Sequence, residues 1–84
     1  MKFCLITFRS VMPAQRGEAL LRRSGVECRI QRTPRWMEEQ GCGYSLRLRC
    51  PDAMAAVGLL EHNEIPYRKV YLHHNSGKLE EMGL

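Results

Sequence analysis

The 84-residue sequence lacks the features that mark several common classes of small protein. It has no Cys-x-x-Cys pair and no cysteine–histidine cluster at zinc-ligand spacing, which disfavours a thioredoxin-like motif and a zinc site. Its longest uncharged apolar run is far too short to span a bilayer. The opening letters MKFCLITF contain one lysine and no small-residue cleavage site, so we expect no signal peptide and a cytoplasmic protein.

No strong excess of charge of either sign is present. The net charge is +4, which permits binding to nucleic acid or another anion but does not require it. With 44% hydrophobic and 26% charged residues, the composition is ordinary for a globular protein. A chain of this length forms one small domain with a marginal core, which oligomerisation would help to stabilise.

Four cysteines are present, and three of them have the setting of structural thiols. Cys4, Cys28 and Cys50 lie in or at the end of strand-like runs, where a thiol acts as a small hydrophobic group. An even count makes a disulfide framework conceivable, but a cytosolic chain keeps its thiols reduced. We therefore expect these three to be core or strand-end thiols rather than partners in redox chemistry.

Hydrophobic periodicity predicts a β-α-β-β-α-β order. This order is typical of an α+β, ferredoxin-like sandwich with a four-stranded antiparallel sheet and two helices on one face. The first strand is apolar on both sides, so we expect it in the middle of the sheet. We expect one domain over residues 1–72, followed by residues 73–84 as a polar tail with the composition of a disordered segment. The expected strands are 2–8, 26–31, 44–50 and 67–72, and the expected helices are 11–24 and 51–62.

Alternation along the strands predicts that the sheet face away from the helices is polar and basic. That face can be an anion-binding surface, half of a dimer interface, or an ordinary solvated face, and the last is the simplest interpretation. The tyrosines on it could stack bases, but the aromatic-rich pattern of RNA-binding sheets is missing. The residues expected there are Glu27, Arg29, Gln31, Ser45, Arg47, Arg49, Tyr67, Lys69 and Tyr71.

Cys42 has a different setting, because it lies between Gly41 and Gly43 and is followed at once by the strand that starts at Tyr44. Glycines allow a sharp turn and the close approach of a ligand or another backbone. We therefore expect Cys42 to be exposed at a loop tip as the reactive residue. The alternative is a loop cysteine with a structural role only.

The surroundings of Cys42 in the sequence restrict its chemistry. Thiolate is the reactive form of cysteine, and Arg32, Arg35 and Arg47 are close enough in the sequence to be candidates for favouring it. Glu38 and Glu39 would oppose them, so the sequence leaves the net effect open. A protease-type nucleophile also needs a positioned base, and no histidine is evidently aimed at residue 42. A thiol that accepts, holds and passes on a sulfur atom needs less machinery, so we expect a carrier rather than a turnover enzyme, with no metal and no cofactor.

The sequence resembles the Putative Se/S carrier protein-like family. The resemblance rests on the strand ending ITF, on TPR at residues 33–35, on CGYSLRL from Cys42, and on PDAMAAVGLLEHNEIPY from Pro51. It covers roughly residues 2–72 and implies handling of sulfur or selenium. By this resemblance Cys42 would carry the persulfide or perselenide. The residues that would shape its loop are Thr33, Pro34, Arg35 and Gly43.

A carrier of this kind needs two protein partners. We expect a sulfur or selenium donor, similar to a cysteine desulfurase, and an acceptor protein. A homodimer is compatible with the open sheet face, whereas a nucleic-acid partner is disfavoured and a membrane partner is not expected. The alternative function is a binding or dimerisation module without covalent chemistry, whose open basic face holds RNA or another anion.

Overall fold

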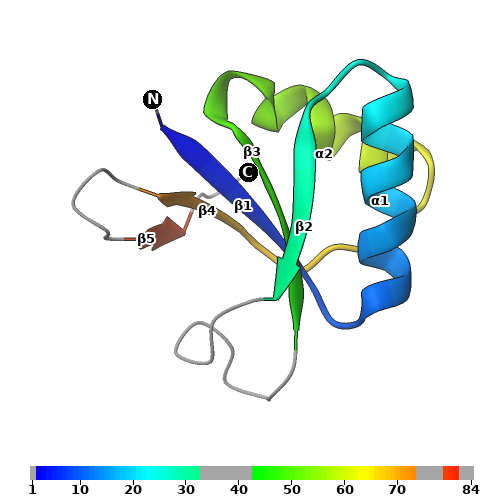
Figure 1. Cartoon of the computed structure of the whole chain (residues 1–84), viewed down its shortest axis with the longest axis horizontal. Coiled ribbons are helices and arrows are strands. Elements are labelled where there is room, and N and C mark those ends of the chain that lie inside the picture. Colours follow the sequence, from blue (N-terminus) through cyan, green and yellow to red (C-terminus); the bar gives the residue numbers. More distant parts are fainter. Residues whose placement is uncertain (1, 33–42, 74–78, 82–84) are drawn as a thin grey trace.

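The computed structural model describes residues 2–32, 43–73 and 79–81. These residues form an antiparallel sheet of five strands in the order β2-β3-β1-β4-β5, together with two helices (Figure 1). The predicted α+β class is confirmed, but the sheet has five strands instead of four. The strands are β1 (Phe3–Phe8), β2 (Cys28–Arg32), β3 (Tyr44–Arg49), β4 (Val70–His73) and β5 (Leu79–Glu81), and the helices are α1 (Val11–Arg23) and α2 (Ala53–His62), with a short 3-10 turn, η2 (Cys50–Asp52), before α2.

Strand β1 lies at the centre of the sheet, as its apolar sequence predicts. It pairs with β3 on one side and with β4 on the other, both antiparallel. Every residue from Cys4 to Phe8 is buried, so both faces of this strand are covered. A strand without an exposed face reads as a continuous apolar run rather than an alternating one.

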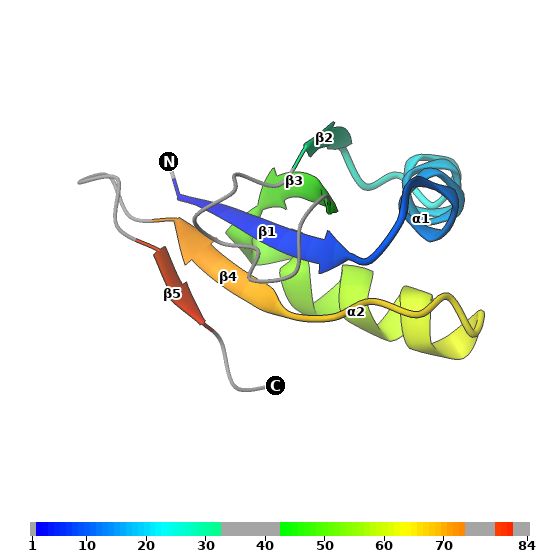
Figure 2. The same cartoon turned by 90° about the horizontal axis from the view of Figure 1, so that it is seen from below.

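Both helices pack on one face of the sheet, where a single core forms (Figure 2). Alternate residues of the strands, such as Ile6 and Leu46, meet Leu21 of α1 and Leu60 of α2 in this core. Gly17 of α1 lies where the two helices and the sheet converge, since a Cβ atom there would be 3.1 Å from Leu60 Cδ2 and 3.3 Å from Leu46 Cδ1. Glycine at this position therefore permits the close approach of α1.

The outer edge of β2 is covered by two side chains of α1. Glu18 Oε2 accepts a hydrogen bond of 2.8 Å from the backbone N–H of Ile30. Arg22 Nε donates to the carbonyl oxygen of Cys28 at 3.2 Å. These contacts satisfy backbone groups that an edge strand otherwise leaves unpaired, and they hinder the addition of another strand at this edge.

Two features of the carboxyl-terminal part differ from the prediction. Strand β5 comes from the segment expected to be a polar tail, and it pairs with β4 through Tyr71 opposite Glu81. Tyr67, expected on the open face of a strand, precedes β4 and packs against the core, where its hydroxyl donates to Glu61 Oε1 at 2.8 Å. Periodicity misplaced Tyr67 because β4 begins only at Val70.

Within the described ranges, none of the helices has the length and apolar character needed to cross a membrane.

Candidate functional site

The residues predicted to surround the reactive thiol fall largely outside the described part of the chain. Thr33, Pro34, Arg35, Gly41 and Cys42 all belong to the segment 33–42, for which no placement is given. The other two predicted residues are described: Gly43 is buried directly before β3, and Arg47 is exposed within it. The site is therefore defined here by the part of the sheet that holds this segment.

The ends of segment 33–42 are fixed side by side. Arg32, the last residue of β2, lies opposite Tyr44, the first residue of β3, and Tyr44 lies opposite Phe8 of β1. Phe8 is fully buried, and Tyr44 packs against the core. We call this end of the sheet the loop end, since segment 33–42 leaves and re-enters the sheet there.

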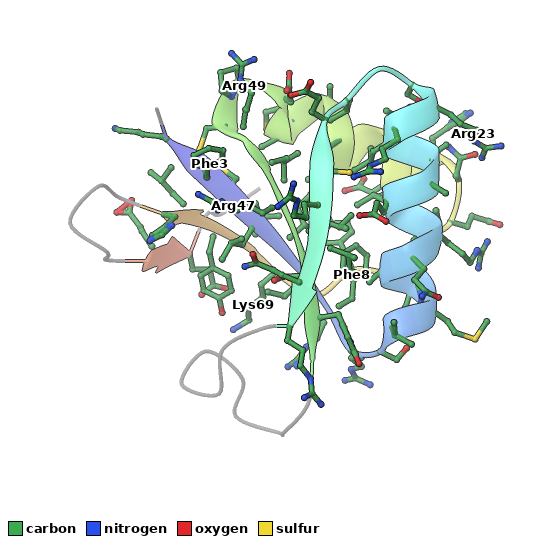
Figure 3. All side chains as sticks on the ribbon, in the orientation of Figure 1. Phe3, Phe8, Arg23, Arg47, Arg49 and Lys69 are labelled. Carbon is green, nitrogen blue, oxygen red and sulfur yellow. The ribbon has the colours of Figure 1, made fainter. Side chains whose placement is uncertain are left out.

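Cations gather at the loop end from three separate parts of the chain. Arg9 directly follows the end of β1, and Arg32 is the last residue of β2. Residues 68–69 lie beside Thr7 of β1, and the backbone N–H of Arg68 donates to Thr7 O at 2.7 Å. Lys69 lies at this end in Figure 3, and its Nζ is 3.4 Å from a carboxylate oxygen of Glu81.

Helix α1 also begins at the loop end, directly after Arg9 and Ser10. The first-turn N–H groups of a helix carry partial positive charge. A groove of about 730 Å³ runs across this region between the start of α1 and the segment before β4. Its lining includes Arg9, Arg16, Arg68 and Lys69, so it is strongly basic. Sequence analysis placed Lys69 on the open sheet face but did not single out Arg9, Arg16 or Arg68, although basic residues at strand ends, as in FR and YRK, are a usable signal.

Arg47 lies toward the opposite end of the sheet. Its guanidinium carbon is 4.1 Å from the centroid of the Phe3 ring, a cation–π contact that directs it away from Gly43 (Figure 3). Phe3 pairs with Arg49 at the far end of β3. The expected influence of Arg47 on the Cys42 thiol stays a prediction.

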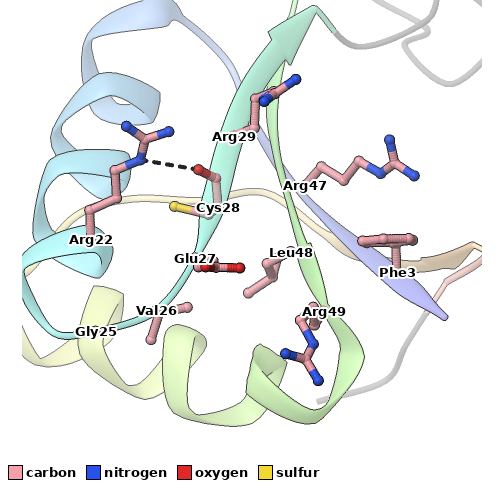
Figure 4. A pocket seen from close by; sticks show the side chains of 10 residues that line it. All are labelled: Phe3, Arg22, Gly25, Val26, Glu27, Cys28, Arg29, Arg47, Leu48 and Arg49. Atoms are coloured by element: carbon pink, nitrogen blue, oxygen red, sulfur yellow. Dashed lines mark hydrogen bonds between the residues drawn. The ribbon is translucent and has the colours of Figure 1, made fainter. Parts of the chain in front are cut away.

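Arg47 belongs to a second basic surface, which we call the arginine groove (Figure 4). This groove has a volume of about 840 Å³. Arg29 and Arg47 lie directly opposite each other in the β2–β3 ladder, where like charges repel. The residues that give the groove its character are Phe3, Arg22, Arg29, Arg47 and Arg49, with Glu27 as its acidic member.

The open face is buried next to the loop end, although both helices lie on the other side of the sheet. Thr7 and Ser45 lie opposite each other in the β1–β3 ladder, and each is at most 5% exposed. The Thr7 hydroxyl donates to Lys69 O at 3.2 Å and accepts from Lys69 N–H at 3.0 Å. Ser45 Oγ makes no hydrogen bond with any described residue, and a buried polar atom without a partner is costly. Ser45 is therefore an unsatisfied polar group within the described part of the sheet, next to the loop end.

Two of the remaining cysteines are poor nucleophiles because they are buried. Burial raises the pKa of the Cys28 thiol, and the nearby Glu18 carboxylate raises it further, against a smaller opposite effect of Arg22. Burial also raises the pKa of Cys4 to about 12, with added contributions from its hydrogen bond to Cys50 and from the Cys50 charge. Since the thiolate is the reactive form, both thiols are poorly nucleophilic at neutral pH.

Cys4 and Cys50 lie much closer together than their separation of 46 positions in the sequence indicates. Their Sγ atoms are 2.7 Å apart, although sequence analysis expected two independent structural thiols. Cys4 is fully buried in β1, whereas Cys50 is partly exposed at the start of η2. This pair lies at the end of β3 opposite Gly43, roughly 20 Å along the strand.

The described residues contain no group of three or more histidine, cysteine or acidic side chains that could hold a metal ion. His73 is part of β4, and its neighbour His74 lies outside the described residues.

Comparison with known proteins adds one match. The sequence model of a protein family described as "Putative Se/S carrier protein-like" matches residues 3–72. This range includes all four cysteines and strands β1 to β4 apart from the last residue of β4, whereas β5 lies outside it. No curated protein and no solved structure matches the chain.

Proposed function

This chain belongs to the Se/S carrier protein-like family, and from that membership we propose that it carries sulfur or selenium on the Cys42 thiol. The family match over residues 3–72 is the observation that carries the proposal. The match includes β2 and β3, which flank segment 33–42, and the central strand β1. The protein would act as a carrier between two partner proteins rather than as an enzyme with a small-molecule substrate.

The proposed transfer is a pair of substitutions at sulfur. The Cys42 thiolate attacks the terminal sulfur of a persulfide on the donor protein, and a new bond forms between Cys42 Sγ and that sulfur. The donor S–S bond breaks, and its electron pair stays on the donor cysteine as thiolate. A nucleophile on the acceptor then attacks the terminal sulfur of the Cys42 persulfide. The terminal sulfur is transferred to the acceptor, and Cys42 is released as thiolate. No net oxidation occurs, and selenium would follow the same steps.

The loop end supports this chemistry electrostatically. Arg9, Arg32 and Lys69 and the amino terminus of α1 lie around the point where segment 33–42 joins the sheet. Positive charge near a cysteine favours its thiolate, and it also attracts an anionic persulfide. Burial makes Cys4 and Cys28 poorly nucleophilic, which disfavours both as carrier sites and leaves Cys50 as the partly exposed thiol that must be tested against Cys42.

The proposed donor is a cysteine desulfurase-like protein, and the proposed acceptor is a second protein that consumes the carried atom. The basic groove at the loop end is suited to a partner whose docking surface is acidic. Such a partner would be steered toward the loop end, and its approach would slow as salt screens the charges.

Loading with a cysteine desulfurase and cysteine tests the proposal. Trypsin cleavage after lysine and arginine places the four cysteines in four different peptides, namely 3–9, 24–29, 36–47 and 50–68. Mass spectrometry of alkylated peptides therefore assigns an added sulfur without ambiguity. The expected result is a persulfide on peptide 36–47, lost in Cys42→Ser and retained in the matched control Cys50→Ser. Loading of Cys42→Ser to the wild-type level would overturn the proposal.

A second candidate function rests on the arginine groove. Arg29 and Arg47 lie opposite each other in the ladder, and Arg49 lies in the same groove. An anion placed between them would relieve their repulsion, and Phe3 offers an aromatic surface beside them. Single-stranded RNA binding that weakens steeply with salt and disappears in Arg29→Ser/Arg47→Ser would support this function. Equal binding by the double variant would exclude it.

A further inference from the structure

The contact between Cys4 and Cys50 points to chemistry that neither the family match nor the carrier proposal includes. A disulfide bond is about 2.0 Å long, and the two Sγ atoms are already 2.7 Å apart. A small rotation of either side chain brings them to bonding distance. The proximity comes from the β1–β3 ladder, in which Cys4 pairs with Leu48 and the backbone N–H of Cys50 donates to Lys2 O at 3.2 Å.

The two thiols differ in their access to solvent. Cys50 is partly exposed at the junction between β3 and η2, where the chain leaves the sheet. Cys4 is fully buried, and among the described residues its thiol contacts that of Cys50. A reagent from solution therefore meets Cys50 first, and Cys4 is positioned to react with whatever forms on Cys50.

We propose that Cys4 and Cys50 form a redox-active dithiol that is converted to an intramolecular disulfide by exchange with low-molecular-weight disulfides. Cys50 is the entering thiol and Cys4 the resolving thiol. The bond would link the start of β1 to the start of η2 and would close a loop across 46 positions of the chain.

The exchange balances in two steps. The Cys50 thiolate attacks one sulfur of the disulfide R–S–S–R, a Cys50–S–S–R bond forms, and R–S⁻ leaves. Cys4 then loses its proton, which the released R–S⁻ takes up, and its sulfur attacks Cys50 Sγ. The second R–S⁻ leaves and is protonated by solvent, which replaces the proton that Cys50 lost. Two cysteine thiols are oxidised by two electrons, and one R–S–S–R is reduced to two RSH.

The high pKa of Cys4 is compatible with its role as resolving thiol. Burial is the largest cause of its raised pKa, followed by the hydrogen bond to Cys50 and the charge of Cys50. The last of these causes disappears once Cys50 has become a mixed disulfide, because its sulfur then carries no charge. The attack is also intramolecular, so the reacting sulfur atoms do not have to meet by diffusion.

Oxidised glutathione is a suitable probe, applied to the reduced full-length chain at low protein concentration. After acid quenching and alkylation of remaining thiols, trypsin digestion without reductant should yield peptide 3–9 linked to peptide 50–68. The intact chain should lose two hydrogen atoms and remain monomeric on a non-reducing gel. A linkage of Cys50 to peptide 24–29 or 36–47 would overturn the proposal, as would a glutathione adduct that persists on wild-type Cys50.

Three variants define the roles of the two thiols. Cys4→Ala should retain the glutathione adduct on Cys50, because it lacks the resolving thiol. Cys50→Ser should leave Cys4 reduced, and this variant tests the order of attack even if Cys4→Ala folds poorly. Cys28→Ala, a buried cysteine outside the pair, should form the 3–9 to 50–68 link as readily as the wild type.

The dithiol proposal can succeed or fail independently of the carrier proposal. In Cys42→Ser the link between Cys4 and Cys50 should still form, whereas sulfur loading should be lost. If the wild type forms the Cys4–Cys50 link but takes up no sulfur from the desulfurase, only the carrier proposal is overturned. If Cys42 takes up sulfur but the Cys4–Cys50 link does not form, only the dithiol proposal is overturned.

Discussion

Arg32 and Tyr44 lie directly opposite each other in the β2–β3 ladder, so segment 33–42 starts and ends at one place in the sheet. Phe8 continues this row on β1, and Arg9 follows it. A basic groove that includes the amino terminus of α1 lies at this end of the sheet. The account of function depends on this arrangement.

Reversing a charge at the loop end should slow sulfur loading. In Arg9→Glu an exposed cation is replaced by an anion beside the place where segment 33–42 begins and ends. We expect the loading rate to fall on the order of 3-fold at low salt and the difference to shrink at high salt, since screening weakens charge–charge effects. Timed mass spectrometry of peptide 36–47 measures this rate.

Arg23→Glu is the matched control for Arg9→Glu. Arg23 is an exposed arginine at the carboxyl-terminal end of α1, the end away from the loop (Figure 3). The same charge change there should alter loading much less. An equal effect of both variants would show that net charge, and not the loop end, controls the rate.

Gly17 should be much less tolerant of substitution than Gly58. In Gly17→Val the new side chain meets Leu60, Leu46 and Phe8 within 3.4 Å of its Cβ position. We expect the free energy of unfolding to fall by about 2 kcal/mol because the core becomes overpacked. Nothing lies within 4 Å of the Cβ position of Gly58, so Gly58→Val should change stability by less than about 0.5 kcal/mol. Urea titration of both variants decides the comparison, and equal effects would contradict the packing of α1.

The reduced protein should lose stability at alkaline pH through Cys4. The pKa of this thiol rises from 9.0 to about 12 on folding, so below pH 9 its contribution to the free energy of unfolding is complete. Above pH 9 the unfolded chain releases the proton while the folded chain retains it. Stability then falls by about 1.4 kcal/mol per pH unit from this group until the folded pKa is reached.

Urea titrations of the wild type and Cys4→Ala at several pH values above 9, with reductant present, isolate this effect. The difference in stability between the two proteins should narrow as the pH rises. A difference that does not change with pH would show that Cys4 ionises equally in the folded and unfolded chains.

Local patterns in the sequence predicted the faces of the strands well. Leu46 lies in the core and Ile30 packs against it, as alternation predicts, because the period of a β-strand is a property of the local backbone. The central position of β1 also followed from its apolar character on both faces. These predictions needed no knowledge of which strands pair.

Features that depend on pairing between distant segments could not be predicted in the same way. The contact between Cys4 and Cys50 depends on the register of β1 against β3. Strand β5 has the sequence Leu-Glu-Glu, which lacks a strand pattern and is stabilised by pairing with β4. The cations at the loop end come from three strand ends that only the topology brings together. The choice of Cys42 as the reactive cysteine, in contrast, rests on its own neighbours Gly41 and Gly43, and it stays a prediction because Cys42 lies outside the described residues.

The most direct test of the carrier account is the location of sulfur on the intact wild-type chain after loading by a cysteine desulfurase. The account predicts one added sulfur, located on peptide 36–47, which is transferred to an acceptor thiol with recovery of the original mass. A persulfide located on peptide 3–9, 24–29 or 50–68, with peptide 36–47 unmodified, would contradict it.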